Sequence, residues 1–225
     1  MEDAMNADDE LVQNLTAMTA VQLETLCANG AVVSPNERDH LSKACKMAAA
    51  AVASEMQVPP VLSPFGFGPL LGWIGLGNVD LVFRWPDRQP IFVELKCGCD
   101  LTDCVWDVVK LSAAVLHGNA ETGYLLAGAP VARWDAGTPG GEFFEEGVWE
   151  TRGRLVRDAY VKSWRRWQNE AVRRRPNRHI PGLIATAFRT VALGRYPFSV
   201  AGVRWEIRAA RVDPAGSESV VWKCV

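Results

Sequence analysis

The chain has 225 residues, of which 48% are hydrophobic and 22% are charged, and its formal net charge is -2 at pH 7. These values are ordinary for a globular protein, and the length suits one domain of above-average size or one domain with an appended region. No apolar run approaches the roughly 20 residues that span a bilayer, so we expect no contact with a membrane. The first ten residues are acidic where a signal peptide would be basic, and we therefore expect a cytoplasmic protein.

Two helices are predicted before residue 57. Residues 10–28 carry apolar side chains at helical spacing and predict a covering helix that ends before Gly30. The second helix begins with Ser34-Pro35-Asn36-Glu37, which is typical of a capping box with proline at the first helical position. Its apolar stripe continues to Glu55 and consists of Leu41, Cys45, Ala48 and Val52. Two interpretations of Glu55 stay open: a carboxylate that reaches solvent, or one directed at whatever the helix covers.

Residues 59–77 are rich in glycine and proline, and they predict a loop followed by a strand at about residues 70–76. A dinucleotide-binding loop is not indicated, because the strand that must precede such glycines and the helix that must follow them are missing.

The next two apolar runs contain three charged residues. Asp80 lies in the first run, Glu94 and Lys96 lie in the second, and a short turn joins the two. Charged side chains are rarely buried in strands unless they are paired or bind a metal ion. Residues two apart share one face of a strand, so Glu94 and Lys96 point the same way. An antiparallel hairpin that pairs Arg84 with Pro90 would place Asp80 directly opposite Glu94.

This arrangement brings two carboxylates and an ammonium group together. Two carboxylates at such short distance repel each other. Either one of them binds a proton, or a divalent cation such as Mg²⁺ lies between them. Lys96 beside such an ion could orient an attacking hydroxide, or it could offset charge that develops on a phosphate in the transition state. The structural alternative is a salt-bridged hairpin at a sheet edge, in which Lys96 pairs with Glu94.

The pattern of Asp80 separated by thirteen residues from Glu94-Leu95-Lys96 resembles the PD-(D/E)XK nuclease superfamily. The chain has Val79-Asp80 where that superfamily usually has Pro-Asp. The resemblance implies an α/β fold with a mixed central sheet flanked by helices, a restriction-endonuclease-like core. It also implies a deoxyribonuclease that uses Mg²⁺ or Mn²⁺, of the kind that serves restriction, phage defence, repair or mobile elements.

The resemblance also assigns roles to individual residues. Asp80, Glu94 and the Leu95 carbonyl would ligate the ion, and Lys96 would position or activate water. Glu55 would complete the acidic cluster, since an acidic residue of the first core helix often joins the metal site in that superfamily. The alternative is an inactive relative that keeps the fold and acts as a nucleic-acid-binding or assembly module.

A helix over residues 102–117 and a strand over residues 122–127 follow the charged strands. Because a helix between two strands requires a crossover, the second strand should run parallel to the Glu94 strand. Asp103, Asp107 and Lys110 lie on the helix side opposite its apolar face. Lys110 matches a polar residue that many relatives place on this helix, but the spacing equally predicts a surface ion pair, which we favour.

Three cysteines, Cys97, Cys99 and Cys104, follow the Glu94 strand with Cys-x-Cys-x4-Cys spacing. Some nucleases of the resembling superfamily hold an iron–sulfur cluster with cysteines. A cluster or a zinc ion needs a fourth ligand, which only the fold could bring from elsewhere in the chain. We interpret these thiols as small residues of the core and of a loop.

A strongly basic segment lies at the start of the final third of the chain. Residues 152–178 contain ten Lys or Arg and two acidic residues. On a helix, Tyr160, Trp164 and Trp167 form a stripe that we expect to pack on the body. The opposite, cationic stripe could lie along a phosphate backbone, and an acidic protein is the other partner that it suits. The residues assigned to nucleic-acid binding are Lys162, Arg165, Arg166, Arg173 and Arg174.

Three regions are expected from these patterns. Residues 1–33 form the N-terminal covering helix, and residues 34–130 form the nuclease-like core. Residues 131–225 comprise an insertion loop or lid, the basic helix, and two strands at residues 198–203 and 205–212 packed on the core. The aromatic residues of the loop and the basic helix are the two candidate contacts for a protein partner. The expected partner is DNA, and a homodimer would be needed to cut both strands.

Overall fold

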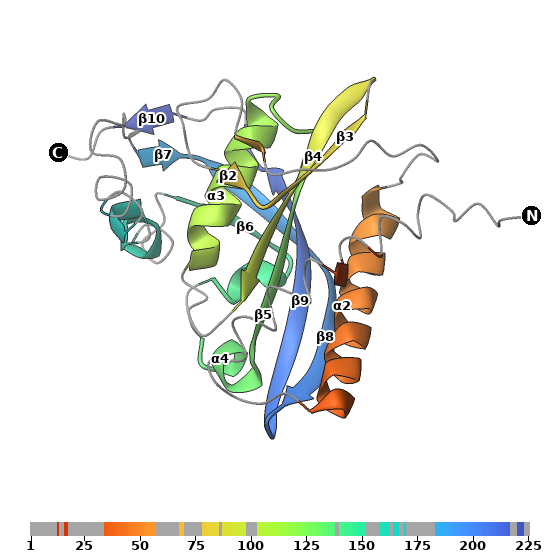
Figure 1. The fold of residues 1–225 in the computed structure, drawn as a ribbon. Helices are drawn as coiled ribbons and strands as arrows, with labels where there is room; N and C mark the ends of the chain where they lie inside the picture. The colour runs from red at the N-terminus through yellow and green to blue at the C-terminus, as the bar shows by residue number, and fades with distance from the viewer. Residues whose placement is uncertain are drawn as a thin grey trace, which may run out of the picture.

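The computed structural model describes residues 34–56, 68–69, 78–85, 87–97, 103–137, 140–151, 158–162, 164–166, 183–216 and 220–222, together with residues 13, 16, 17 and 169. Its centre is a six-stranded mixed sheet in the order β3-β4-β5-β9-β8-β6. Helix α2 covers one face of this sheet and helix α3 covers the other (Figure 1). The α/β class with a mixed, helix-flanked sheet is therefore confirmed. Within the described ranges, no helix is long and apolar enough to cross a membrane.

Helix α2 (Pro35–Met56) begins at the predicted residue. The Ser34 N–H donates to Glu37 Oε2 at 2.9 Å, and the Glu37 N–H donates to Ser34 Oγ at 3.3 Å, so the capping box is formed. The predicted apolar stripe, Leu41, Cys45, Ala48 and Val52, is buried against the sheet. The helix expected at residues 10–28 lies outside the described residues, apart from three helical positions.

The predicted hairpin forms one edge of the central sheet. Strand β3 (Leu81–Trp85) pairs antiparallel with β4 (Arg88–Cys97), and Leu81 lies opposite Val93. This register is the one that an Arg84 to Pro90 pairing predicts, although the ladder is irregular between Phe83 and Trp85.

Two short strands precede the hairpin. Strands β1 (Gly68–Pro69) and β2 (Asn78–Val79) form a separate two-stranded sheet. The strand expected at residues 70–76 lies outside the described residues.

The crossover that follows the hairpin is the predicted one. Helix α3 (Asp103–Leu116) leads to β5 (Thr122–Pro130), which pairs in parallel with β4 and places Leu125 beside Glu94. The close approach of α3 to β5 requires a small residue, because a Cβ at Gly123 would lie 2.9 Å from Leu111 Cβ.

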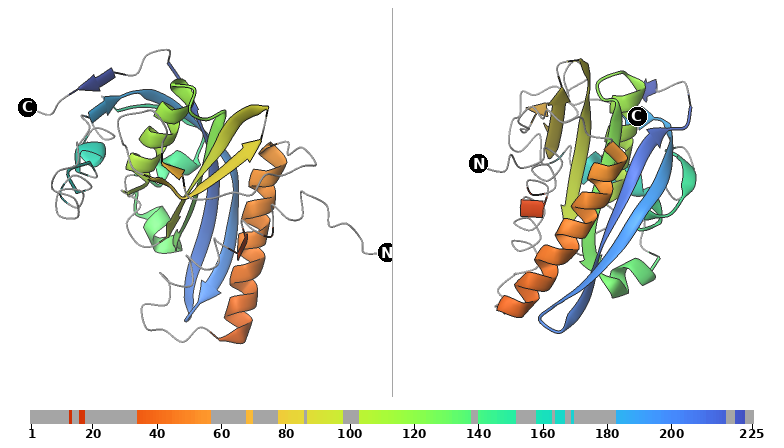
Figure 2. Two further views of the ribbon diagram at one scale, coloured as in Figure 1. Left: turned by 45° about the horizontal axis from the view of Figure 1, so that its top comes forward. Right: turned by 90° about the vertical axis from the view of Figure 1, so that its right-hand side faces the viewer.

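The C-terminal strands form a long hairpin that widens the sheet. Strand β9 (Val203–Pro214) pairs antiparallel with both β5 and β8 (Ala187–Val200). The predicted strand at residues 198–203 straddles the hairpin turn, where Ala201 and Gly202 have φ values of 50° and 73°. Two positive φ values are typical of a type I′ turn, which suits the twist of a hairpin. Strands β7 (Leu183–Ala185) and β10 (Val220–Trp222) form a small separate sheet (Figure 2).

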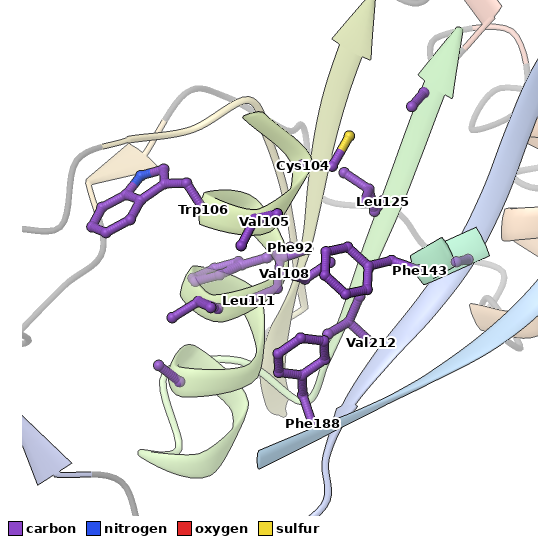
Figure 3. Close-up of a cluster of buried hydrophobic side chains, with 14 of the residues drawn as sticks. Phe92, Cys104, Val105, Trp106, Val108, Leu111, Leu125, Phe143, Phe188 and Val212 are labelled. Carbon is purple, nitrogen blue, oxygen red and sulfur yellow. The ribbon is translucent and has the colours of Figure 1, made fainter. Parts of the chain in front are cut away.

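The expectation of a loop or lid between residues 130 and 151 is wrong. The segment contains α4 (Val131–Asp135), a 3-10 turn η1 (Glu142–Phe144) and β6 (Gly147–Glu150), which is the outer strand beside β8. The aromatic rings of Phe143 and Phe144 are buried, and Phe143 lies against the α3 side of the core (Figure 3). Phe143 and Phe144 therefore serve packing rather than a protein contact, and Trp134 is buried as well.

Candidate active site

The alternation of side chains along β4 separates the two faces of the sheet. Phe92 belongs to the core beneath α3, whereas Val93 and Leu95 belong to the core beneath α2. Glu94 therefore emerges on the α3 side, and Lys96 emerges on the same side two residues further on. The sequence prediction that these two side chains share a face is confirmed.

Asp80 is the residue that joins β2 to β3 in the chain. Its Oδ2 accepts a hydrogen bond of 2.8 Å from the Leu95 N–H, which fixes the carboxylate against the adjacent strand. The negative charge of Asp80 is near enough to contribute to a raised pKa of Glu94. The hairpin therefore brings Asp80 and Glu94 together, as the register predicts.

Glu94 is buried, with 1% of its surface exposed. Its Oε1 is in contact with the Lys110 ammonium group, and Lys110 is only 5% exposed. A carboxylate without water depends on neighbouring cations for its stability, because burial favours the neutral form of a charged group. Lys110 supplies that cation from the middle of α3.

Asp107 connects the two lysines. Its Oδ2 lies 3.0 Å from Lys96 Nζ, and its Oδ1 lies 3.4 Å from Lys110 Nζ. The expectation that Asp107 and Lys110 form a surface ion pair is wrong: they pair, but both are buried. The four charges of Lys96, Asp107, Lys110 and Glu94 alternate in sign along a continuous chain of contacts, which we name the charge relay cluster.

The pKa values of the cluster follow from burial and from this alternation. Burial raises the pKa of Glu94 well above that of an exposed glutamate, and the Lys110 ammonium acts in the opposite direction. Burial by itself would lower the pKa of Lys110, but the carboxylates of Glu94 and Asp107 raise it on balance. Lys110 is therefore a permanent cation at neutral pH.

Lys96 is the most accessible member of the cluster, with 35% of its side chain exposed. Its pKa is raised, chiefly by the Asp107 carboxylate and with a smaller contribution from Glu94, against the lowering effect of burial. An amine whose pKa is raised stays protonated, so it cannot take a proton from water at neutral pH. Orienting a nucleophile and offsetting phosphate charge, two of the roles predicted for Lys96, fit a protonated amine.

Glu55 lies on the other side of the sheet. Its Oε2 accepts a bond of 2.7 Å from Arg211 Nη1, and Arg211 also bonds to Asp213. Arg211 is the β9 partner of Tyr124, whose ring packs in the core beneath α2. The structure therefore does not bring Glu55 to Asp80 and Glu94: the sheet separates them.

The described part of the basic segment packs against the outer side of α3. Residues 158–162 and 164–166 are helical. Tyr160 and Trp164 are buried, and the Tyr160 ring stacks on Trp106 with a centroid separation of 5.8 Å. Trp106 points away from the sheet (Figure 3), so Tyr160, a member of the predicted aromatic stripe, covers the outer side of α3 there.

The cationic side of this helix faces outward. Lys162, Arg165 and Arg166 are exposed, and Arg166 Nη1 lies 3.2 Å from Asp103 Oδ2 at the start of α3. Asp103 precedes Asp107 by one helical turn, which places the basic helix beside the charge relay cluster. Arg173 and Arg174 lie outside the described residues.

The structure describes the side chains of Cys104 and Cys45. Cys104 and Cys45 are buried, on opposite faces of the sheet. Cys99 lies outside the described residues, as does the side chain of Cys97. The interpretation of Cys104 as a small core residue agrees with its burial.

Asp80 and Glu94 offer carboxylate oxygens, the type of ligand that a hard divalent ion prefers. The described residues contain no group of three or more His, Cys, Asp or Glu side chains arranged to hold a metal ion. A site here would therefore rest on the carboxylates of Asp80 and Glu94, with main-chain oxygen and water completing the coordination. Mg²⁺ is commonly held in this way, by one or two carboxylates and several waters.

Comparison of the chain with protein-family models, with curated proteins and with solved structures finds no match. The function of the site must therefore be inferred from its own residues.

Asp107 and Lys110 are the members of the site that the sequence analysis misplaces. One signal could have found them: α3 carries apolar residues on every side, including Val105, Trp106 and Val109. A helix that is hydrophobic all round is buried, and charges within it must then be paired inside the protein.

Proposed function

We propose that the protein is a divalent-metal-dependent phosphodiesterase that hydrolyses DNA at the Asp80–Glu94 pair, on a restriction-endonuclease-like core. The observation that carries the proposal is the geometry of the hairpin. The Asp80 carboxylate accepts a hydrogen bond from the Leu95 N–H, next to buried Glu94, and the Lys96 side chain lies on the same face of β4 as Glu94. The order of α2, hairpin, α3 and parallel β5 also agrees with the fold that the resemblance implies.

Asp80 and Glu94 would hold Mg²⁺ or Mn²⁺, with the Leu95 carbonyl as a further ligand. When bound, such an ion supplies a Lewis acid that polarises a phosphoryl oxygen and lowers the pKa of coordinated water. Mg²⁺ prefers oxygen donors, which is what this pair provides.

Lys96 acts through its permanent positive charge. Asp107 holds its ammonium group in place, and the exposed part of the side chain can meet a phosphate at the surface. A preorganised cation stabilises the negative charge that grows on the phosphoryl oxygens in the transition state.

The basic helix supplies the means to hold a polyanion. Lys162 and Arg165 are exposed on its outer side, next to the start of α3. Cations on one face contact phosphates without reading the base sequence, so this surface suits binding of DNA rather than recognition of a site. Restriction, phage defence, repair or mobile-element functions are all compatible with such an enzyme, and a homodimer would allow both strands to be cut.

A second function is favoured by one specific observation. The charge relay cluster is neutral by itself, because two carboxylates face two ammonium groups, and Lys110 already contacts Glu94. A protein that keeps this cluster only to stabilise its core would be an inactive nucleic-acid-binding or assembly module of the same fold.

Cleavage assays separate the two functions. Wild type and Lys96→Ala are incubated with supercoiled plasmid and with single-stranded DNA in Mg²⁺, in Mn²⁺ and in chelator, while DNA binding is measured in parallel. The enzyme predicts ion-dependent cutting that Lys96→Ala reduces by about a hundredfold or more. Binding without cutting under all conditions would contradict it and support the inactive module. Negligible binding even at low salt would point instead to an acidic protein partner.

A further inference from the structure

We propose that Lys110 is a built-in counter-ion of Glu94 that a divalent ion must displace, so that the site alternates between a lysine-closed state and a metal-loaded state. The inference rests on the proposed function, because it concerns the same carboxylate. It adds a regulatory competition to the site, and it assigns Lys110 a role that neither the sequence analysis nor the proposed chemistry requires.

The first step concerns the occupancy of Glu94. The Lys110 ammonium is in contact with Glu94 Oε1, and both side chains are excluded from solvent. A buried carboxylate needs positive charge nearby, and in this structure an internal lysine provides it. A hard cation that used Glu94 as a ligand would approach the same oxygen atoms.

The second step concerns repulsion. An ammonium group and a divalent ion a few ångströms apart repel strongly where water is scarce, because little solvent screens their charges. Lys110 and a metal ion therefore compete for Glu94. Lys110 has a second carboxylate partner, Asp107. Asp107 Oδ1 lies 3.4 Å from Lys110 Nζ, so the ammonium can leave Glu94 without becoming an unpaired buried charge.

The third step concerns Lys96. Asp107 already binds Lys96 through Oδ2, at 3.0 Å. If Lys110 shifts toward Asp107, that carboxylate is shared more evenly between two ammonium groups, and Lys96 is held less tightly. Loading of the site therefore weakens the Lys96–Asp107 contact without breaking it, so the ammonium group of Lys96 stays in place with more of its charge available to a phosphate.

Mn²⁺ binding to the full chain tests the competition without relying on catalysis. Lys110→Gln removes the internal cation, and Lys46→Gln, on the exposed side of α2, makes the same change of charge on the opposite face of the sheet. Free Mn²⁺ is measured by electron paramagnetic resonance during titration of wild type and both variants. We expect Lys110→Gln to bind Mn²⁺ at least about tenfold tighter than wild type and Lys46→Gln to match wild type.

The outcomes distinguish this inference from the proposed function. Equal or weaker binding by Lys110→Gln, beside a wild type that binds, overturns the competition and leaves the metal-dependent enzyme standing. If neither wild type nor Lys110→Gln binds Mn²⁺, both the competition and the metal-dependent enzyme are overturned. Binding by Lys110→Gln alone supports the competition and contradicts the enzyme, because the wild-type site would then be locked by its own lysine.

A second measurement covers the case in which Lys110→Gln does not fold. In wild-type protein carrying ¹⁵N-labelled lysine, the Lys110 side-chain signal is followed by nuclear magnetic resonance while Mg²⁺ is added. Displacement predicts a saturable shift of Lys110 and Lys96 that surface Lys46 does not show. Unchanged Lys110 and Lys96 signals at saturating Mg²⁺ overturn the inference.

Discussion

The ammonium group of Lys96 lies 3.0 Å from Oδ2 of Asp107, a residue on the helix that crosses behind the strand of Lys96. This contact ties the exposed lysine of the candidate active site to the interior of the protein. It also raises the pKa of Lys96, which favours the positively charged form of the side chain.

Removal of the Asp107 charge should destabilise the protein strongly. Asp107→Asn leaves two ammonium groups with too few buried partners, and breaking a buried pair in this way costs about 3 kcal/mol or more. The free energy of unfolding is measured by urea titration of wild type and variant. Asp103→Asn is the matched control, because it makes the same change one turn earlier on α3 in an exposed pair with Arg166.

The control should change the free energy of unfolding by less than about 1 kcal/mol, as is usual for surface ion pairs. Equal effects of Asp103→Asn and Asp107→Asn would show that the charge relay cluster does not stabilise the core.

The capping box at the start of α2 should give a pH-dependent stability. The Ser34 main-chain and side-chain hydrogen bonds lower the pKa of Glu37, and the Glu37 carboxylate also accepts from the Ala201 N–H at the tip of the β8–β9 hairpin. A lowered folded-state pKa means that the stabilisation is present above the ordinary glutamate pKa and is lost as pH falls through the folded value.

Thermal unfolding of wild type and Glu37→Gln tests this effect between pH 7 and pH 3. We expect the variant to have the lower Tm at neutral pH, and the difference to shrink as the carboxylate of wild type takes up a proton. A difference in Tm that stays constant across this range would contradict the assignment. Ser34→Ala, which removes the other half of the box, should cost about 1 kcal/mol.

Gly123 should not tolerate a side chain. A Cβ at this position of β5 would lie 2.9 Å from Leu111 Cβ, so Gly123→Ala forces α3 away from the sheet. Overpacking of this kind typically costs about 1–3 kcal/mol. At Gly216 an added Cβ would find its nearest neighbour, Ala187 Cβ, at 3.8 Å, so Gly216→Ala is the control. Urea titration that ranks the two variants equally would show that α3 can adjust at no cost.

The basic helix should contribute to DNA affinity in a manner that depends on salt. Lys162→Ala and Arg165→Ala each remove one exposed cation, and each should reduce the slope of log affinity against log salt by about one. Fluorescence anisotropy with labelled duplex DNA between low and moderate salt measures the slope. Lys46→Ala, on the far side of the sheet, should leave it unchanged. Identical slopes for all the variants would place the DNA elsewhere.

The local features of the fold could be predicted from sequence because short-range chemistry determines them. Ser34 and Glu37 define a helix start, and the spacing between Asp80 and Glu94 fixes the hairpin register once a short turn is assumed. The parallel direction of β5 follows from the crossover through α3. These relationships involve neighbours in the chain, or elements whose connection leaves few alternatives.

Relationships between distant elements could not be predicted in the same way. Arg211 is 156 residues from Glu55, and only the pairing of β9 with β5 brings it close enough to bind that carboxylate on the α2 face. The burial of Asp107 and Lys110 accompanies their contacts with Lys96 and Glu94, which only the packing of α3 on β4 brings within reach. The segment after Pro130 reads as a loop because glycine and proline interrupt its sequence between residues 137 and 141, whereas its buried phenylalanines pack in the core.

The rate of Mn²⁺-dependent plasmid cleavage by Glu94→Gln, measured beside Glu55→Gln, tests the central claim most directly. Both variants exchange a glutamate for its amide, but the two positions lie on opposite faces of the sheet. If Asp80 and Glu94 form the catalytic site, Glu94→Gln loses at least about a hundredfold in rate and Glu55→Gln stays within a few fold of wild type. Loss of cleavage in Glu55→Gln with Glu94→Gln as active as wild type would contradict the proposed site.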